Sequence, residues 1–301
     1  TLVGVLAEPT GAPEALCAVL LNSGALRRIG PHRMSVETAR RFAARGVPTL
    51  RLDLAGIGDS DAEGGADPAR FASDDAFYVP EFVDHTRAAL DALEDRGLPP
   101  RFVLGGLCSG AYWSFYAALE DDRVAAVLML NPRTLLYDDW VHAVRQTRDL
   151  RRKLVSRDAW RRVVRREASF ARPFRIAAAF LSQALRAPFR LVGTMAARRR
   201  AAAVGGDPID LAFDRLRDRG QRAFMFFTGL EPLHEEFERD GRIRRFDRWP
   251  NIQLETIPLR VDTHLLRPLW LQREAHELVD AALEREVELA RTVQQQPRVR
   301  A

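Results

Sequence analysis

Short apolar runs recur along the chain and alternate with stretches of helical periodicity. We expect seven strands, at residues 2–6, 16–21, 47–54, 102–105, 124–130, 223–228 and 252–257. Amphipathic patterns between and after them predict helices at residues 36–45, 82–96, 112–119 and 270–289. Strands that alternate with helices are typical of a parallel sheet covered on both faces, whose buried strands are apolar throughout. The pattern therefore predicts the α/β class, with a mostly parallel, doubly wound sheet.

The alternation breaks once, between residues 133 and 205, where several consecutive helices are expected instead. Turn residues at 205–208, with the sequence Gly-Gly-Asp-Pro, end this stretch. We therefore predict a core domain formed by residues 1–132 and 206–301, with a helical cap inserted at residues 133–205.

Charge is distributed unevenly between the two predicted parts. The whole chain carries a net charge of +5, yet residues 133–200 contain 18 arginine and lysine residues against five aspartate and glutamate residues. Such a basic cap is suited to an acidic partner or a phosphate group, although a solvated arginine-rich surface would have the same composition. No zinc-finger, helix-turn-helix or stacking motif accompanies the charge, so nucleic acid is not an expected partner. The candidate phosphate-binding or carrier-binding residues are Arg151, Arg152, Arg161, Arg162, Arg165 and Arg166.

Composition excludes several other classes of protein. No apolar run approaches the roughly 18 residues of a membrane span, and the first residues lack the pattern of a signal peptide. The two cysteines, Cys17 and Cys108, are too few for a disulfide framework, and Cys17 lies within an apolar run typical of the core. We expect a cytoplasmic location, with no metal and no resident cofactor.

The segment Gly-Gly-Leu-Cys-Ser-Gly-Ala, at residues 105–111, has the form of a nucleophile elbow centred on Cys108. A strand that turns sharply into a helix strains the nucleophile's backbone and admits only small residues two positions away. Gly106 and Gly110 satisfy that demand. Ser109 is the weaker candidate, because centring the pattern on it would place Leu107 at a small-residue position. The alternative is a glycine-rich turn with a buried structural cysteine.

A thiol nucleophile needs a base, and the base needs a carboxylate to orient it. His264 follows the last predicted strand, at the edge where open α/β sheets bind ligands. Glu231 is the first carboxylate after the preceding strand and is our candidate orienting acid, with Glu235 and Asp262 as competitors. The chain order of nucleophile, acid and histidine is that of the α/β-hydrolase fold.

The oxyanion hole is expected to use backbone N–H groups from two loops. One donor is Ser109, directly after the nucleophile, and the second is Gly24 or Ala25, after an early strand. Residues 51–60 form a further glycine-containing turn, Arg-Leu-Asp-Leu-Ala-Gly-Ile-Gly-Asp-Ser. It lacks the third glycine of a dinucleotide fingerprint and the Gly-Lys of a P-loop, so we interpret it as a structural turn.

In this order and spacing, the motifs resemble the α/β-hydrolase superfamily over residues 1–132 and 206–301. Residues 22–33 and 106–111 resemble a smaller group that includes exosortase-associated hydrolases and the cysteine-dependent aminoacyl shuttles of nonribosomal peptide pathways. The resemblance implies a Cys108–His264–Glu231 triad. It also implies transfer of an acyl group between the phosphopantetheine thiols of two carrier proteins. Glutamate at position 231 departs from the commoner aspartate.

These observations predict an acyl or aminoacyl transferase that works through a covalent acyl-Cys108 intermediate. A cysteine acyl-enzyme is a thioester, so exchange with other thioesters is nearly isoenergetic and reversible. The expected partners are a small acyl or aminoacyl substrate and an acidic acyl or peptidyl carrier protein, whose phosphopantetheine, or coenzyme A, carries the acyl group. The alternatives are a thioesterase or carboxylic ester hydrolase with the same triad, and a non-catalytic binding protein of the same fold.

Overall fold

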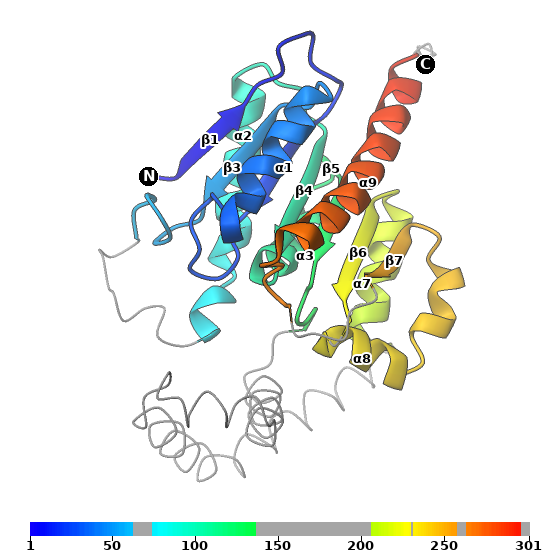
Figure 1. Ribbon diagram of the computed structural model, residues 1–301. Coiled ribbons are helices and arrows are strands. Elements are labelled where there is room, and N and C mark those ends of the chain that lie inside the picture. Colours follow the sequence, from blue (N-terminus) through cyan, green and yellow to red (C-terminus); the bar gives the residue numbers. More distant parts are fainter. Residues whose placement is uncertain (63–73, 137–205, 230, 258–262, 296–301) are drawn as a thin grey trace, which may run out of the picture. The chain divides into compact units, whose positions relative to one another are not determined.

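The computed structural model describes residues 1–62, 74–136, 206–229, 231–257 and 263–295, in which the strands form a seven-stranded sheet (Figure 1). The strand order is β1-β3-β2-β4-β5-β6-β7, with β1 antiparallel to β3 and all other neighbours parallel. All seven predicted strands and the mostly parallel α/β class are confirmed. The strands are β1 (Val3–Ala7), β2 (Cys17–Leu21), β3 (Thr49–Asp53), β4 (Phe102–Leu107), β5 (Val124–Leu130), β6 (Arg222–Thr228) and β7 (Ile252–Ile257).

Helices cover both faces of the sheet. Helices α1 and α9 lie side by side over one face, and α2 and α3 lie together behind it (Figure 1). The predicted helices are present, although α9 is longer than its amphipathic pattern indicated. The helices are α1 (Met34–Ala44), α2 (Glu81–Asp95), α3 (Ser109–Glu120), α7 (Pro208–Asp218), α8 (Pro232–Arg239) and α9 (Leu269–Gln295), and the short 3-10 turns are η1 (Pro31–Arg33), η3 (Asp74–Phe77) and η4 (Ile243–Arg248).

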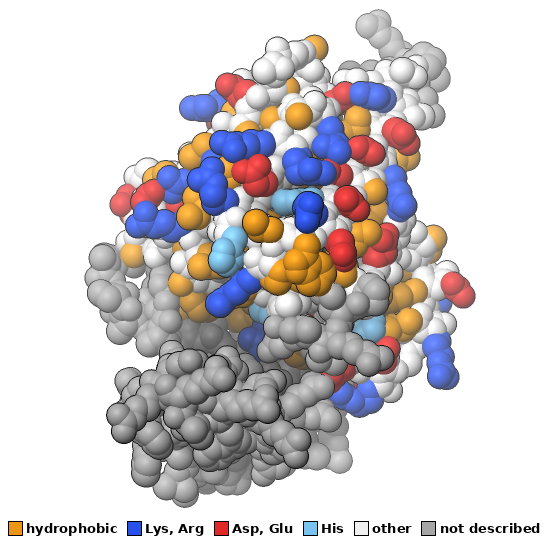
Figure 2. Space-filling view, viewed as in Figure 1, with side chains coloured by type: hydrophobic (Ala, Val, Ile, Leu, Met, Phe, Trp, Pro, Cys, Tyr) orange, Lys and Arg blue, Asp and Glu red, His pale blue; other side chains and the backbone are white. Residues whose placement is uncertain are grey.

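The core lies where α1 and α9 pack on the central strands. Every residue of β2 is buried, and Phe42 of α1 and Leu283 of α9 are fully buried in the same apolar cluster. Burying a side chain of this size contributes about 2 kcal/mol to folding. The outer surfaces of the two helices are joined by ion pairs, including Arg45 with Glu284, and Figure 2 shows charges of both signs interspersed there.

The parallel strands bring their carboxyl ends to one edge of the sheet. Leu107, at the end of β4, pairs with Leu130, at the end of β5, and Thr228 of β6 pairs with Ile257 of β7. Residues that directly follow these four strands therefore gather at a common edge. This is the edge at which open α/β sheets bind ligands.

The chain divides into two compact units, residues 1–135 with 212–301, and residues 136–211. Residues 137–205, which include most of the predicted cap, lie outside the described part, so the predicted domain boundaries stay a prediction. Within the described ranges, none of the helices combines the length and the apolar composition that crossing a membrane requires.

Candidate active site

Cys108 occupies a sharp turn between β4 and α3, as the elbow pattern predicted. Its backbone has φ 59° and ψ −115°, a conformation that L-residues rarely adopt and that costs about 1–3 kcal/mol. Its N–H donates to the carbonyl of Leu130 at 3.0 Å, which fixes the turn against the neighbouring strand. Cys108 is only partly buried, whereas Cys17 is fully buried in the core, where burial raises the pKa of its thiol to about 12. Cys108 is therefore the accessible thiol of the two.

The two glycines that flank Cys108 allow the backbone to approach itself closely. A Cβ on Gly106 would lie 2.5 Å from the carbonyl carbon of Gly110. A Cβ on Gly110 would lie 2.5 Å from the carbonyl oxygen of Asn22, in the loop after β2. Both contacts are with backbone atoms, which cannot rotate away. The requirement for small residues at these positions is confirmed, and its cause is the packing of α3 against β4 and the loop after β2.

His264 lies in the loop between β7 and α9, and its imidazole faces Glu231. The Nδ1 atom of His264 is 2.9 Å from Oε2 and 3.0 Å from Oε1 of that carboxylate. Glu231 is buried, just before the first turn of α8. Both carboxylate oxygens of Glu231 thus lie within hydrogen-bond distance of the same His264 nitrogen. The competing candidate Asp262 lies outside the described residues. A carboxylate at Nδ1 holds the proton there and leaves Nε2 to face the nucleophile.

The imidazole of His264 also interacts with the thiol of Cys108. Nε2 of His264 is buried without a hydrogen-bond partner among the described residues. Burial acts to lower the pKa of the imidazolium, but the interactions of His264 with Cys108 and Glu231 outweigh it and raise the pKa to about 10. Cys108 and Leu265 also pack against one apolar cluster, which contains Leu266. The two leucines directly follow His264 in the chain. The three predicted triad residues are therefore brought together.

This raised pKa predicts a loss of stability in alkali. The pKa of His264 rises from 6.5 to about 10, so its stabilising effect is complete below about pH 6.5 and is lost as the pH rises through about 10. We expect the free energy of unfolding of the parent to fall more steeply between about pH 7 and pH 10 than that of His264→Gln. Urea titrations at each pH measure both. Parallel curves would show that folding does not tighten proton binding at His264.

Asn131 is a site residue that the sequence analysis missed. It directly follows β5, is 1% exposed, and has a positive φ of 42°. Its Nδ2 donates to the carbonyl of His264 at 2.9 Å and to Oγ1 of Thr228 at 3.0 Å. An isolated asparagine after an apolar strand carries no motif. The only available signal was its place at the carboxyl end of a predicted strand.

The predicted oxyanion loop lies beside the elbow. The N–H of Gly24 donates to Oγ of Ser109 at 2.8 Å, which ties the loop after β2 to the first residue of α3. The structure thus brings Ser109 and Gly24 together, but this bond occupies the Gly24 donor. The oxyanion roles of the Ser109 and Ala25 backbone N–H groups stay predictions.

The glycine-containing turn after β3 holds this loop in place. Asp53 is fully buried and accepts hydrogen bonds from Nδ2 of Asn22 at 2.9 Å and from the backbone N–H of Arg28 at 2.6 Å. The guanidinium of Arg28 also pairs with this carboxylate. Oδ1 of Asn22 in turn accepts the N–H of Leu54 at 2.7 Å. The turn has a structural role, as predicted. Its hydrogen bonds hold the loop after β2, which contains the candidate oxyanion donors.

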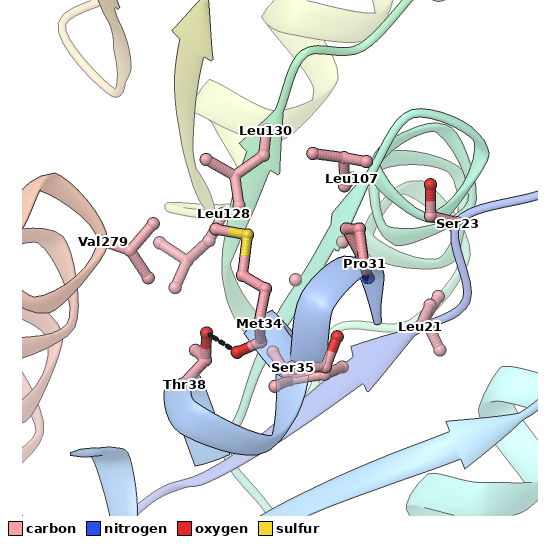
Figure 3. A pocket seen from close by; sticks show the side chains of 13 residues that line it. Leu21, Ser23, Pro31, Met34, Ser35, Thr38, Leu107, Leu128, Leu130 and Val279 are labelled. Carbon is pink, nitrogen blue, oxygen red and sulfur yellow. Dashed lines mark hydrogen bonds between the residues drawn. The ribbon is translucent and has the colours of Figure 1, made fainter. Parts of the chain in front are cut away.

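A small cavity lies behind the elbow, between the sheet and helices α1 and α9 (Figure 3). Its walls include Leu107, Leu130, Met34 and Val279, and its volume is about 30 Å³. A cavity of this size accommodates about two water molecules, so it is too small for an acyl chain. We interpret it as a packing void beside the nucleophile.

The remaining site predictions concern residues or groups that the structure does not place. The six candidate cap arginines, at positions 151, 152, 161, 162, 165 and 166, lie outside the described residues. Within the described residues, no group of three or more histidine, cysteine, aspartate or glutamate side chains is arranged to hold a metal ion.

Comparison with known proteins identifies the fold. No protein-family model matches the chain, and no curated protein matches it. Among solved structures, Est1E from Butyrivibrio proteoclasticus with bound ferulic acid is 16% identical, with a TM-score of 0.50 over 94% of each chain. The putative α/β hydrolase ATU1826 from Agrobacterium tumefaciens is 12% identical, with a TM-score of 0.50 over 95% of this chain and 93% of that chain. At this identity the likeness concerns the fold, and together with the sheet order it establishes that the chain has the α/β-hydrolase fold.

Proposed function

We propose that the protein is an acyltransferase that moves an acyl group between thioesters through a covalent acyl-Cys108 intermediate. The observation that carries this proposal is the arrangement of the three side chains. Cys108 stands on a strained elbow, His264 interacts with it and has a buried Nε2, and Glu231 lies 2.9 Å from Nδ1 of His264. A protonated imidazole beside a thiol favours the reactive thiolate.

The chemistry of each half-reaction uses these groups in turn. The Cys108 thiolate attacks the carbonyl carbon of the donor thioester, and the resulting oxyanion is stabilised by backbone N–H groups. The carbon–sulfur bond to the donor breaks, and His264 gives its proton to the departing thiolate. An acceptor thiol then passes its proton to His264 and attacks the acyl-Cys108 thioester, which regenerates the Cys108 thiolate. Glu231 stabilises the imidazolium before and after these proton transfers and keeps the neutral imidazole oriented in between.

Sulfur at position 108 is the reason to propose transfer rather than hydrolysis. Donor, intermediate and product are all thioesters, so neither half-reaction requires a large change in free energy. The acyl group would arrive on phosphopantetheine of an acidic carrier protein or on coenzyme A. Hydrolysis by the same triad, with water as the acceptor, is the second candidate. A protein that only binds a partner is the third.

A loading experiment distinguishes these three functions. The protein is treated with p-nitrophenyl acetate, desalted, and followed by intact mass with and without pantetheine as acceptor. We expect an acetyl adduct that persists in buffer and is discharged by pantetheine, in the parent and in the matched control Cys17→Ala. Cys108→Ala is expected to form no adduct.

The outcomes separate as follows. Rapid release of acetate in buffer without pantetheine would contradict transfer and support hydrolysis. A parent that forms no more adduct than Cys108→Ala would contradict both catalytic functions. Cys108→Ser replaces the thioester intermediate with an oxygen ester, so under the proposed chemistry its adduct should no longer exchange readily with pantetheine.

A further inference from the structure

We propose that Asn131 is a positioning residue for the site, because its carboxamide joins the strand end that leads to Glu231 to the loop that carries His264. The inference rests on the proposed function of Cys108 as nucleophile. Asn131 does not contact Cys108 in any hydrogen bond that we observe among the described residues, so its action would pass through the two groups that activate the thiol.

The contacts of Asn131 connect three segments that are far apart in the sequence. Its Nδ2 donates to the backbone carbonyl of His264, 133 positions away, at 2.9 Å. Its Oδ1 accepts the N–H of Thr228, 97 positions away, at 2.8 Å, and its own N–H donates to Phe226 at 2.8 Å. Both hydrogens of the amide are used, since the second is donated to Oγ1 of Thr228. The side chain thus fixes the end of β6 and the histidine loop to one rigid group.

The backbone at this position explains why asparagine stands there. A φ of 42° lies in the left-handed region, which asparagine tolerates better than most residues. Strained positions persist only where the surroundings over-determine them, and they cluster at functional sites. Asn131 and Cys108 each follow a neighbouring strand, β5 and β4, and both have positive φ. The strained backbone of Asn131 therefore lies at the same edge of the sheet as that of Cys108.

The Asn131 amide acts on the position of His264, and thereby on the contacts with Cys108 and Glu231 that raise its pKa. Thr228 Oγ1 lies 3.4 Å from Oε1 of Glu231, which is long for an O–H···O bond, so this contact contributes little. The bond to the His264 carbonyl is the short one. It holds the backbone from which the imidazole projects toward both Glu231 and Cys108. Because a shift of about 1 Å in a catalytic group can cost up to about 10²-fold in rate, a loosened histidine loop should slow acylation.

The test compares Asn131→Gly with Asn251→Ala. Glycine accepts the left-handed backbone, so the first variant removes the amide without adding strain. Asn251 precedes β7 at the opposite edge of the sheet, where its Nδ2 donates to the carbonyl of Gln221 at 2.8 Å, and it serves as the matched control. The measurement is the burst of p-nitrophenolate from p-nitrophenyl acetate as a function of pH. We expect a burst roughly 10-fold slower in Asn131→Gly, with a displaced pH profile, and an unchanged burst in Asn251→Ala.

A second variant keeps the test decisive if Asn131→Gly does not fold. Asn131→Asp retains the size, the tolerance of positive φ and the acceptor oxygen, but its ionised carboxylate has no hydrogen to donate to the His264 carbonyl, so it should also be slower. Parent-like bursts in a folded Asn131 variant, or an equal slowing in Asn251→Ala, would overturn the inference. A parent without any burst would overturn the proposed function itself, and the inference with it.

Discussion

His264→Ala is expected to lower the rate constant for acylation of Cys108 by about 10³-fold at neutral pH. The variant removes the group that takes the thiol proton and returns it to the leaving group. It also leaves the buried carboxylate of Glu231 without the imidazole at 2.9 Å. The rate is measured as the p-nitrophenolate burst with p-nitrophenyl acetate, and circular dichroism confirms that the variant is folded.

Two controls separate a role in catalysis from a role in structure. His32→Asn changes an exposed histidine in η1, just before α1, and asparagine tolerates its positive φ of 48°, so its burst should match that of the parent. Added imidazole should partly restore the burst in His264→Ala. An undiminished burst in His264→Ala would show that another base activates Cys108.

Gly110→Ala is expected to destabilise the protein by about 3 kcal/mol, despite alanine's advantage of about 1 kcal/mol in a helix. The added Cβ would lie 2.5 Å from the Asn22 carbonyl oxygen and 2.9 Å from that of Leu21. Relief requires α3 and the loop after β2 to separate. That movement would also break the 2.8 Å bond between Gly24 and Ser109, so the acylation rate should fall as well.

Gly11→Ala is the matched control for this prediction. A Cβ at Gly11 would meet no atom within 4 Å, and its φ is not positive. Urea denaturation should therefore find Gly11→Ala close to the parent and Gly110→Ala far less stable. Equal stability of the two variants would contradict the close approach at the elbow.

The fold could be predicted from local pattern because burial shapes the sequence of each element. Strands covered on both faces must be apolar throughout, and the run at residues 16–21 became β2, in which every residue is buried. The elbow was also visible locally, because Gly106 and Gly110 lie within five residues of chain. The close approach of Gly110 to the Asn22 carbonyl, in contrast, exists only in the folded chain. Helix α9 extends beyond the predicted residues 270–289, because an amphipathic pattern needs buried positions and within the helix only Ala290 is buried after residue 289.

Only the tertiary structure showed which of the candidate carboxylates contacts His264. Glu231 and Glu235 lie four residues apart and both follow β6, so spacing alone left them in competition. Folding of the chain at Pro232 places Glu231 just before α8, where its carboxylate meets Nδ1 of His264. Asn131 could not be predicted at all, because its hydrogen bonds to Thr228 and His264 form only once residues 97 and 133 positions away are brought to it.

The sequence by itself determined the α/β class, the turn at Cys108 and the chain order of the candidate nucleophile, acid and histidine, since each depends on neighbouring residues or on chain order. Only the tertiary structure decided which carboxylate contacts His264, which amide hydrogen-bonds to the His264 loop, and that the N–H of Gly24 is already bonded to Ser109. These are contacts between segments distant in the chain. Their geometry is set by the parallel register of β4 to β7, which no local pattern encodes.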